Sequence, residues 1–576
     1  MRLFSLFVIV TAAAAASNSQ SCRCFPGDEC WPSPSTWNEF NKTIDGRLIA
    51  TAPLGSPCHD PSYDETLCTQ LRAAWTDPKP HYQSSSSVMA PFFANASCDP
   101  FHAITKPCLL GNYISYAVNV SAASHVSKTL SFAKKHNIRL VIRNTGHDYQ
   151  GKSTGAGGLG LWMHHLKELT YTTHSDKYYN GPALRMGAGV QGFEAYTAAD
   201  ERGYQVVGGE CPTVGVSGGY TQGGGHSALS SRYGLGADQA LAWEVVDGMG
   251  RHIVVTRENE HRDLYWALSG GGGATYAVVL SLTVKVHPST PVSGLNLTFA
   301  RDGLSKETYY TAIESFQKVQ APLVDAGGMA ITIFTNQSFI LSPVTGPDIP
   351  VATLLQLLEP FTSTLDNLNI KYQMYSAQFP SYLSQFQEMQ GPIPVGMAQY
   401  GGWLIPRSVV LSQTAELTTA FTDIFEDGGT VINVALDVSN RVAGDVDNAV
   451  LPAWREALVH STLTTVWDWT DERGMIEAQR KMTEEYVPRL QRLAPQSGAY
   501  LNEGDFQQPD FQRAFYGENY ERLRATKGVY DPDDLFYALT GVGSEAWEQK
   551  ADGRLCRVET QDLVKGKGSP SHYDEL

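Results

Sequence analysis

The sequence predicts an α+β protein in two parts, the second of which contains a large antiparallel sheet covered by helices. Three observations carry this prediction. At 576 residues the chain is too long for one compact core. From about residue 121 to 290, helical and buried apolar patterns alternate as in α/β units. Beyond 290, alternating strand patterns are separated by amphipathic helical stretches.

The first part opens with a helix that is followed directly by a strand. Val126, Leu130 and Ala133 recur at helical spacing within 121–137, and the apolar run IRLVIRN (138–144) follows as a buried strand. Asp247–Gly250 lies between two β-branched runs and predicts a hairpin turn. Further strand patterns lie at 183–190, 204–209, 242–256 and 274–288.

The second part alternates strands with helices. Its predicted strands are the runs NLTFA, GMAITIF, GMAQYGGWLIP and TVINVALDV. Its predicted helices are TLLQLLEPFTSTLDNL and EAQRKMTEEYVPRLQRL. The last stretch, about 500–560, contains an Asp-Pro turn and is expected to return to the first part.

The composition and the two ends of the chain limit which partners and which compartment are expected. The net charge of −16 argues against nucleic acid or an anionic membrane as a partner. Residues 1–19 read as a signal peptide with an apolar stretch too short to span a bilayer, the alternative being an N-terminal anchor helix. The C-terminal YDEL is either a weak ER-retention signal or, as we favour, a solvated acidic end.

Cysteine usage supports an oxidising compartment. Seven of the nine cysteines precede residue 110, as expected of disulfide staples in a secreted chain, whereas a zinc site at Cys22–Cys30 lacks a second ligand pair. The spacings of Cys58 to Cys68 and of Cys98 to Cys108 suggest local loops, with connectivity left open. Cys211 is the natural unpaired residue. Sequons for N-glycosylation lie at Asn41, Asn95, Asn119, Asn296 and Asn336.

Three glycine-rich loops carry the strongest chemical signal. They are TGHDYQGKSTGAGG after the strand LVIRN, GGECPTVGVSGGYTQGGGHS (208–227), and ALSGGGGATYAVV. Free backbone N–H groups in such loops can cradle a pyrophosphate. The GxGxxG match at 155–160 lacks an immediately preceding strand and does not predict a Rossmann site, and metalloprotease, α/β-hydrolase and P-loop motifs are absent from the sequence.

These loops, together with YGLGADQ and the C-terminal YLNEGDFQQPDFQRAFYGENY, resemble flavin-linked oxidases of the vanillyl-alcohol oxidase superfamily. The chain is most similar to berberine-bridge-enzyme-like proteins, and among them to secreted isoamyl-alcohol-oxidase-like proteins of fungi. The resemblance covers about 100–290 and 495–550. The domains it implies are a signal peptide (1–19), a disulfide-stapled extension (20–105), a PCMH-type FAD-binding domain (106–290), a substrate domain (291–495), a berberine-bridge-like segment (496–560) and a tail (561–576).

The resemblance implies that FAD is the cofactor and that it is bound through two covalent bonds. His147 would bond the 8α-methyl group of the flavin and Cys211 would bond its C6 atom. Valine at position 214 is associated in the family with access of O2. Further cofactor contacts are expected from Asn144, Thr145, Gly146, Asp148, Val214, Gly215, Gly218, Gly219, Gly224 and Asn502.

The same resemblance implies the catalytic residues. A base must take the hydroxyl proton as hydride leaves the substrate. Tyr500 and Asn502 match the Y-x-N element of the family, so Tyr500 is the expected base, with Glu503 or Asp505 as helpers. Relatives often carry a more basic residue after this element, and Glu503 departs from that pattern.

These observations predict a secreted, monomeric oxidase with a small-molecule substrate and O2 as partners, and no metal. The expected reaction is hydride transfer from an alcohol to FAD followed by formation of H2O2. Two alternatives stay open: a flavoprotein of secondary metabolism that performs oxidative cyclisation, and a binding glycoprotein with an inactive flavin fold.

Overall fold

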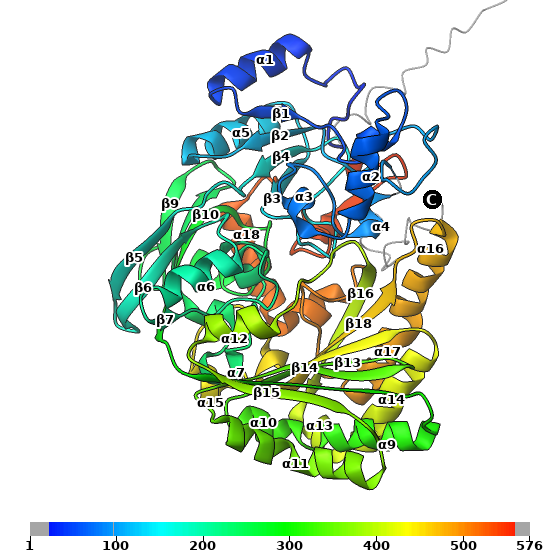
Figure 1. The fold of residues 1–576 in the computed structure, drawn as a ribbon. Coiled ribbons are helices and arrows are strands. Elements are labelled where there is room, and N and C mark those ends of the chain that lie inside the picture. Colours follow the sequence, from blue (N-terminus) through cyan, green and yellow to red (C-terminus); the bar gives the residue numbers. More distant parts are fainter. Residues whose placement is uncertain (1–21, 96, 559–576) are drawn as a thin grey trace, which may run out of the picture.

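The computed structural model describes residues 22–95 and 97–558, so the expected signal peptide and the YDEL end lie outside the described residues. Figure 1 shows the two parts, with the N-terminal half above and the large sheet of the second part below it. Helices and strands are mixed in both parts, which confirms the predicted α+β class. Within the described ranges, no helix is long and apolar enough to cross a membrane.

The first sheet carries the first glycine-rich loop. Its predicted helix is α5 (Ala123–Lys135), which buries Val126, Leu130 and Ala133. The strand after it is β3 (Leu140–Arg143), which pairs in parallel with β4 (Leu159–Trp162). The order in this sheet is β1-β2-β4-β3, with β1 at Leu48–Ala50 and β2 at Tyr116–Asn119.

The second sheet is antiparallel and has the order β5-β6-β10-β8-β9. The predicted hairpin is present, and the carboxylate of Asp247 closes its turn by accepting the backbone N–H of Arg251 at 2.9 Å. The strand expected at 204–209 is only β7 (Tyr204–Gln205), because the following residues leave the ladder and lead into the second glycine-rich loop. The strands are β5 (Leu169–Ser175), β6 (Asn180–Gly187), β8 (Ala240–Asp247), β9 (His252–Thr256) and β10 (Ala277–Lys285).

The large sheet has the order β15-β12-β14-β13-β17-β18-β16, and all its neighbouring strands are antiparallel. Helices α9 (Lys306–Gln317), α10 (Gln320–Asp325), α11 (Val351–Asn367) and α14 (Thr414–Glu426) cover one face (Figure 1), so its other face is left for the first part. The strands are β12 (Val292–Ala300), β13 (Met329–Phe334), β14 (Ser338–Pro347), β15 (Gln373–Phe379), β16 (Ala398–Pro406), β17 (Thr430–Ala435) and β18 (Ala457–Val466).

The C-terminal segment returns to the first part through a buried ion pair. Lys527, in α18 (Tyr520–Tyr530), is 2% exposed. Its Nζ donates to Asp531 Oδ2 at 2.6 Å, to the carbonyl of Thr275 at 3.0 Å and to that of Phe536 at 2.9 Å. Since Thr275 lies within the third glycine-rich loop, this lysine holds the C-terminal segment against that loop.

Eight of the nine cysteines form disulfides. Cys24–Cys30, Cys58–Cys68 and Cys98–Cys108 close short loops, and Cys211 is free, as its isolation in the sequence predicts. These bonds leave no zinc-binding thiols at Cys22–Cys30.

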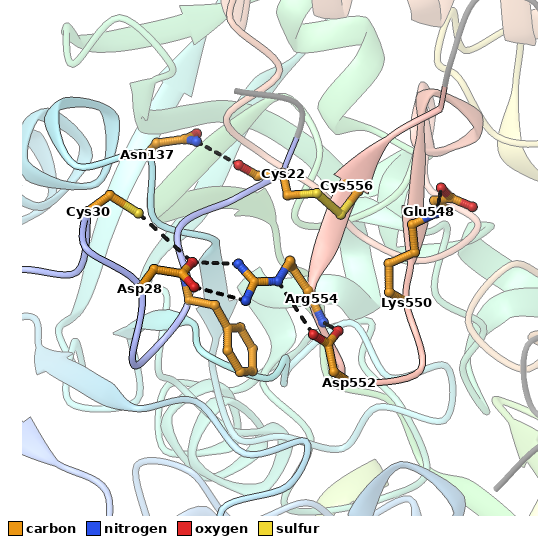
Figure 2. The surroundings of a disulfide bond; sticks show 10 residues. Cys22, Asp28, Cys30, Asn137, Glu548, Lys550, Asp552, Arg554 and Cys556 are labelled. Atoms are coloured by element: carbon orange, nitrogen blue, oxygen red, sulfur yellow. Dashed lines mark hydrogen bonds and ion pairs between the residues drawn. A yellow bond between two sulfur atoms is a disulfide. The ribbon is translucent and has the colours of Figure 1, made fainter. Parts of the chain in front are cut away.

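The fourth disulfide joins the two ends of the described chain. Cys22 is bonded to Cys556, at a sequence separation of 534 (Figure 2). Beside it, the guanidinium of Arg554 makes a two-pronged ion pair with Asp28, and Asn137 donates to the carbonyl of Cys22 at 2.8 Å. An N-terminal arm and a C-terminal hairpin are thereby held together.

The five sequons differ in exposure. Asn95 and Asn336 are exposed. Asn41 and Asn119 are half-buried and accept hydrogen bonds through their side-chain oxygens, and the side-chain oxygen of Asn296 is buried. Asn95 and Asn336 are therefore the better placed to accept a glycan.

Candidate active site

The three glycine-rich loops line one cavity, together with the C-terminal segment. The loop after β3, most residues of the stretch 209–222, and Gly273–Ala274 border it. Gly224 and Asp505 are not among the residues that border it: Gly224 has a φ of +118°, and a Cβ atom there would meet Tyr500 and Leu235, whereas Asp505 is buried and accepts a hydrogen bond from Gln479. The predicted residues that do border it are Asn144, Thr145, Gly146, His147, Asp148, Cys211, Val214, Gly215, Gly218, Gly219, Tyr500, Asn502 and Glu503.

The glycines of the second loop serve two different purposes. A Cβ atom at Gly215 would lie 2.4 Å, and one at Gly218 2.7 Å, from Asn144 Nδ2, so both allow the Asn144 side chain to approach the loop backbone. Gly219 is exposed among buried neighbours, borders the cavity, and has space around the position of a Cβ atom. At Gly219, bare backbone therefore faces the cavity.

His147 and Cys211 meet at one hydroxyl group. Thr213 Oγ1 lies 2.7 Å from His147 Nε2 and 3.6 Å from Cys211 Sγ. Burial, with lesser effects of His81 and Arg143, lowers the pKa of His147 to about 3, and burial raises the pKa of the Cys211 thiol. A neutral His147 that donates from Nε2 to Thr213 presents the lone pair of Nδ1.

A cluster of four ionisable side chains lies at the same cavity. His226 Nδ1 is 3.2 Å from Glu210 Oε2, and His226 Nε2 is 3.1 Å from Glu503 Oε1. The other oxygen of Glu503 lies 2.8 Å from His460 Nε2. Glu210, His226 and Glu503 border the cavity, and His460 is fully buried behind them. We refer to Glu210, His226, Glu503 and His460 as the acidic–histidine cluster.

The charges in this cluster follow from burial and pairing. Burial disfavours a charged His226, but Glu210 and Glu503 outweigh it and hold the pKa of His226 well above 6.5. Burial likewise opposes a charged Glu503, but His226 and His460 hold the pKa of Glu503 well below its usual range. Burial lowers the pKa of His460. The cluster thus holds an imidazolium at His226 next to the Glu503 carboxylate.

Tyr500 and Asn502 form a separate pair on the cavity wall. Asn502 Nδ2 donates to the hydroxyl oxygen of Tyr500 at 2.8 Å and to the carbonyl of Gly219 at 3.0 Å. Burial and the nearby carboxylate of Glu503 raise the pKa of Tyr500 strongly. The phenol therefore keeps its proton and is a hydrogen-bond donor.

Four side chains of the site were missed by the sequence analysis: Glu210, His226, His460 and Lys152. Glu210 and His226 lie within the second glycine-rich loop itself, so their place beside Cys211 was a usable signal. Lys152 follows His147 in the first loop, borders the cavity, and has its pKa lowered to about 8 by burial.

Comparisons with known proteins define the class of this site. Residues 114–256 match the family described as FAD binding domain, and residues 499–543 match the family described as berberine and berberine like. Both matched segments contribute side chains to the cavity. The fold and the site are therefore those of an FAD-dependent enzyme.

Proteins of similar sequence and structure identify the family within this class. The chain is 47% identical to FAD-linked oxidoreductase ZEB1 of Gibberella zeae, covering 94% of this chain and 96% of that one. It is 40% identical to bifunctional decalin synthase calF of Penicillium decumbens, covering 96% and 99%. The crystal structure of the VAO-type flavoprotein MtVAO615 from Myceliophthora thermophila C1 superposes with a TM-score of 0.89 at 40% identity, covering 93% and 100%. The chain belongs to the FAD-linked oxidoreductases of the vanillyl-alcohol-oxidase and berberine-bridge type.

The residues present fit FAD. Asn144 Oδ1 is buried without a hydrogen-bond partner, which is costly unless a ligand donates to it. The bare backbone at Gly219 leaves room for a flat ring, and the neutral His147 and the free thiol of Cys211 are nucleophiles beside it. When bound, FAD supplies the two-electron acceptor.

Proposed function

We propose that this protein is a secreted oxidase that removes a hydride from an alcohol and passes the electrons to O2, giving H2O2. FAD would be attached through both His147 and Cys211. The observation that carries the proposal is the shared position of these two residues, which are far apart in sequence, border one cavity and both contact the Thr213 hydroxyl.

Different side chains would serve the covalent attachment of FAD and its non-covalent binding. Thr213 contacts the His147 ring through Nε2, which would leave Nδ1 available for attachment of the flavin, and its hydroxyl also lies 3.6 Å from the thiol of Cys211. Asn144 offers a buried acceptor, and Asn502 supports the backbone of Gly219. Val214 borders the cavity, and in the proposed reaction its small side chain would admit O2.

The substrate end of the cavity favours a neutral molecule. Glu210 and Glu503 place two carboxylate side chains at this end, and only His226 lies between them. An anionic substrate would be repelled there. Tyr500, which keeps its proton, is suited to donate a hydrogen bond to a substrate oxygen rather than to act as the base.

The test is a flavin measurement followed by a substrate panel. We expect a yellow protein whose colour stays with the polypeptide after denaturation in acid. The purified, flavin-loaded protein is then offered primary, secondary and benzylic alcohols and oligosaccharides, and H2O2 is measured. A flavin-free preparation would contradict the proposed cofactor attachment, and no H2O2 with the whole panel would contradict the oxidase reaction.

Oxidative cyclisation is the second candidate function. It is favoured by the similarity to a relative named bifunctional decalin synthase. The same scaffold would then form a ring in a polyketide-like or alkaloid-like precursor. Activity on such a precursor, with no H2O2 from the alcohol panel, distinguishes this function from alcohol oxidation.

Secretion is supported by the disulfides, since four such bonds are typical of proteins that fold in an oxidising compartment. Asn95 and Asn336 are the sequons best placed to carry glycans. We propose that the enzyme acts as a monomer. Mass spectrometry of the secreted protein, before and after removal of glycans, tests cleavage after residue 19 and occupancy of these sites together.

A further inference from the structure

We propose that Glu210 is the catalytic residue that accepts the hydroxyl proton of the substrate, and that His226 positions it and connects it to Glu503. This inference rests on the proposed alcohol oxidation and names the base for it. Glu210 precedes Cys211 in the sequence, so it lies next to the proposed flavin attachment.

One oxygen of Glu210 is unpaired. Glu210 is 8% exposed, borders the cavity, and its Oε1 has no hydrogen-bond partner. A buried carboxylate oxygen without a partner is unfavourable, because it has lost its hydrogen bonds to water. A substrate hydroxyl that donates to this oxygen removes the penalty and places its proton on the path to Glu210.

The carboxylate of Glu503, by contrast, is already occupied by hydrogen bonds. Both oxygens of Glu503 are engaged: Oε1 by His226, and Oε2 by His460 and by the hydroxyl of Thr462 at 3.2 Å. Tyr500 keeps its own proton. Among the described acidic side chains on the cavity wall, Asp148 is likewise occupied by the backbone N–H groups of its own loop. Glu210 is left as the acceptor.

His226 lies between the two carboxylates. Its Nε2 is hydrogen-bonded to Glu503 Oε1, whereas its Nδ1 makes an ion-pair contact with Glu210 Oε2 at 3.2 Å that lacks hydrogen-bond geometry. This contact involves Oε2 of Glu210, which leaves Oε1 for the substrate. The other titratable side chains that face this cluster include Tyr149, Tyr196, Cys211, Tyr220, Tyr382, Tyr400 and Tyr500.

The substrate loses a hydride from carbon and a proton from oxygen. The carbon–hydrogen bond breaks and its hydrogen leaves with the electron pair, for which bound FAD would supply the acceptor in the proposed reaction. The oxygen–hydrogen bond breaks, its proton goes to Glu210 Oε1, and its electron pair forms the second bond of the carbonyl product. The proton passes to solvent when product leaves.

A divalent cation among His226, His460 and Glu503 is the competing interpretation, because their ligand atoms lie within 4.8 Å of one another. We favour the protonated network because hydrogen bonds already account for both oxygens of Glu503. Metal analysis of the purified holoenzyme separates the two interpretations.

The decisive experiment compares Glu210→Gln, Glu210→Asp and His226→Gln in the flavin-loaded enzyme, with the alcohol that the unchanged enzyme oxidises fastest. We expect Glu210→Gln to lower kcat by about 100-fold or more, with unchanged flavin content, and Glu210→Asp to recover part of the loss. In His226→Gln, the acidic limb of kcat/KM against pH should shift. Glu244→Gln is the matched control, since Glu244 pairs with Arg185 away from the cavity.

A second readout does not depend on turnover. Because the pKa of His226 is raised on folding, its ion pairs stabilise the protein fully below about pH 6.5, and this stabilisation is lost as the pH rises through the raised value. The melting temperature of the unchanged enzyme should therefore fall above pH 6.5 more steeply than that of His226→Gln. Glu244→Gln should keep the steep fall.

Several outcomes would overturn the inference. One is a Glu210→Gln variant that keeps its flavin and oxidises the alcohol within twofold of the unchanged enzyme. Another is an identical pH dependence of melting for His226→Gln and the unchanged enzyme. A third is a stoichiometric metal ion whose removal abolishes turnover. If the unchanged enzyme oxidises no alcohol, the proposed function fails as well, whereas activity retained in Glu210→Gln removes this inference alone.

Discussion

Replacing Thr213 by valine removes the hydroxyl group at which His147 and Cys211 meet, with little change in side-chain volume. The bond to His147 Nε2 is short, at 2.7 Å, and that to Cys211 Sγ is longer, at 3.6 Å. Loss of one such hydrogen bond corresponds to about 0.5–1.5 kcal/mol, so the fraction of His147 in the attaching orientation should fall about 2- to 12-fold. We expect covalent attachment of FAD to slow by that factor.

The assay starts from protein made without flavin and follows attachment after FAD is added. Samples are precipitated with acid at intervals, and the flavin that stays with the polypeptide is measured by absorbance and intact mass. Thr221→Val is the control, because Thr221 is buried in the same segment, donates to the carbonyl of Val216 at 2.7 Å and does not border the cavity. Attachment in Thr213→Val at the rate of the unchanged protein would refute the reasoning.

Three further predictions concern attachment and stability. Cys211→Ala should leave FAD held by His147 alone, which is seen as retained flavin after denaturation without the cysteinyl-flavin absorbance; a persisting cysteinyl spectrum would contradict it. Gly219→Ala should fold normally, because a Cβ atom there meets nothing within 4 Å, yet bind less FAD; an unchanged flavin-to-protein ratio would count against a ring at Gly219. Lys527→Met should lower the free energy of unfolding in urea by about 3–5 kcal/mol, because it leaves the Asp531 carboxylate buried without a cation. A decrease in the free energy of unfolding below about 1 kcal/mol would show that Asp531 needs no cation.

The parts of the fold that local pattern determines could be predicted. The α5–β3 unit and the β8–β9 hairpin follow from periodicity and turn residues. The three glycine-rich loops could be recognised from their glycine content. β18 (ALVHSTLTTV) was missed, because its polar residues are buried between two strands and give no alternation. His460 lies in β18, so it was missed as a site residue for the same reason.

The candidate site was predicted where sequence neighbours share a loop and missed where tertiary contacts decide. His147 and Cys211 stand out within their own motifs. The pairing of His226 with Glu503 joins residues 277 positions apart, and no local pattern carries it. The expectation that Tyr500 is the base came from a motif, whereas the burial that chiefly raises its pKa, with a lesser effect of Glu503 in the same motif, arises from tertiary packing.

The bond between Cys22 and Cys556 turns almost the whole described chain into a covalent ring. A single cut by a protease in any surface loop between them opens this ring without releasing a fragment. The large sheet and the glycine-rich loops then remain parts of one molecule, and the cut ends can stay docked by their own packing. A flavin bonded to both His147 and Cys211 would add a smaller ring inside the first. In a compartment where proteases are common and reductants are scarce, such a chain can be nicked and still be one enzyme.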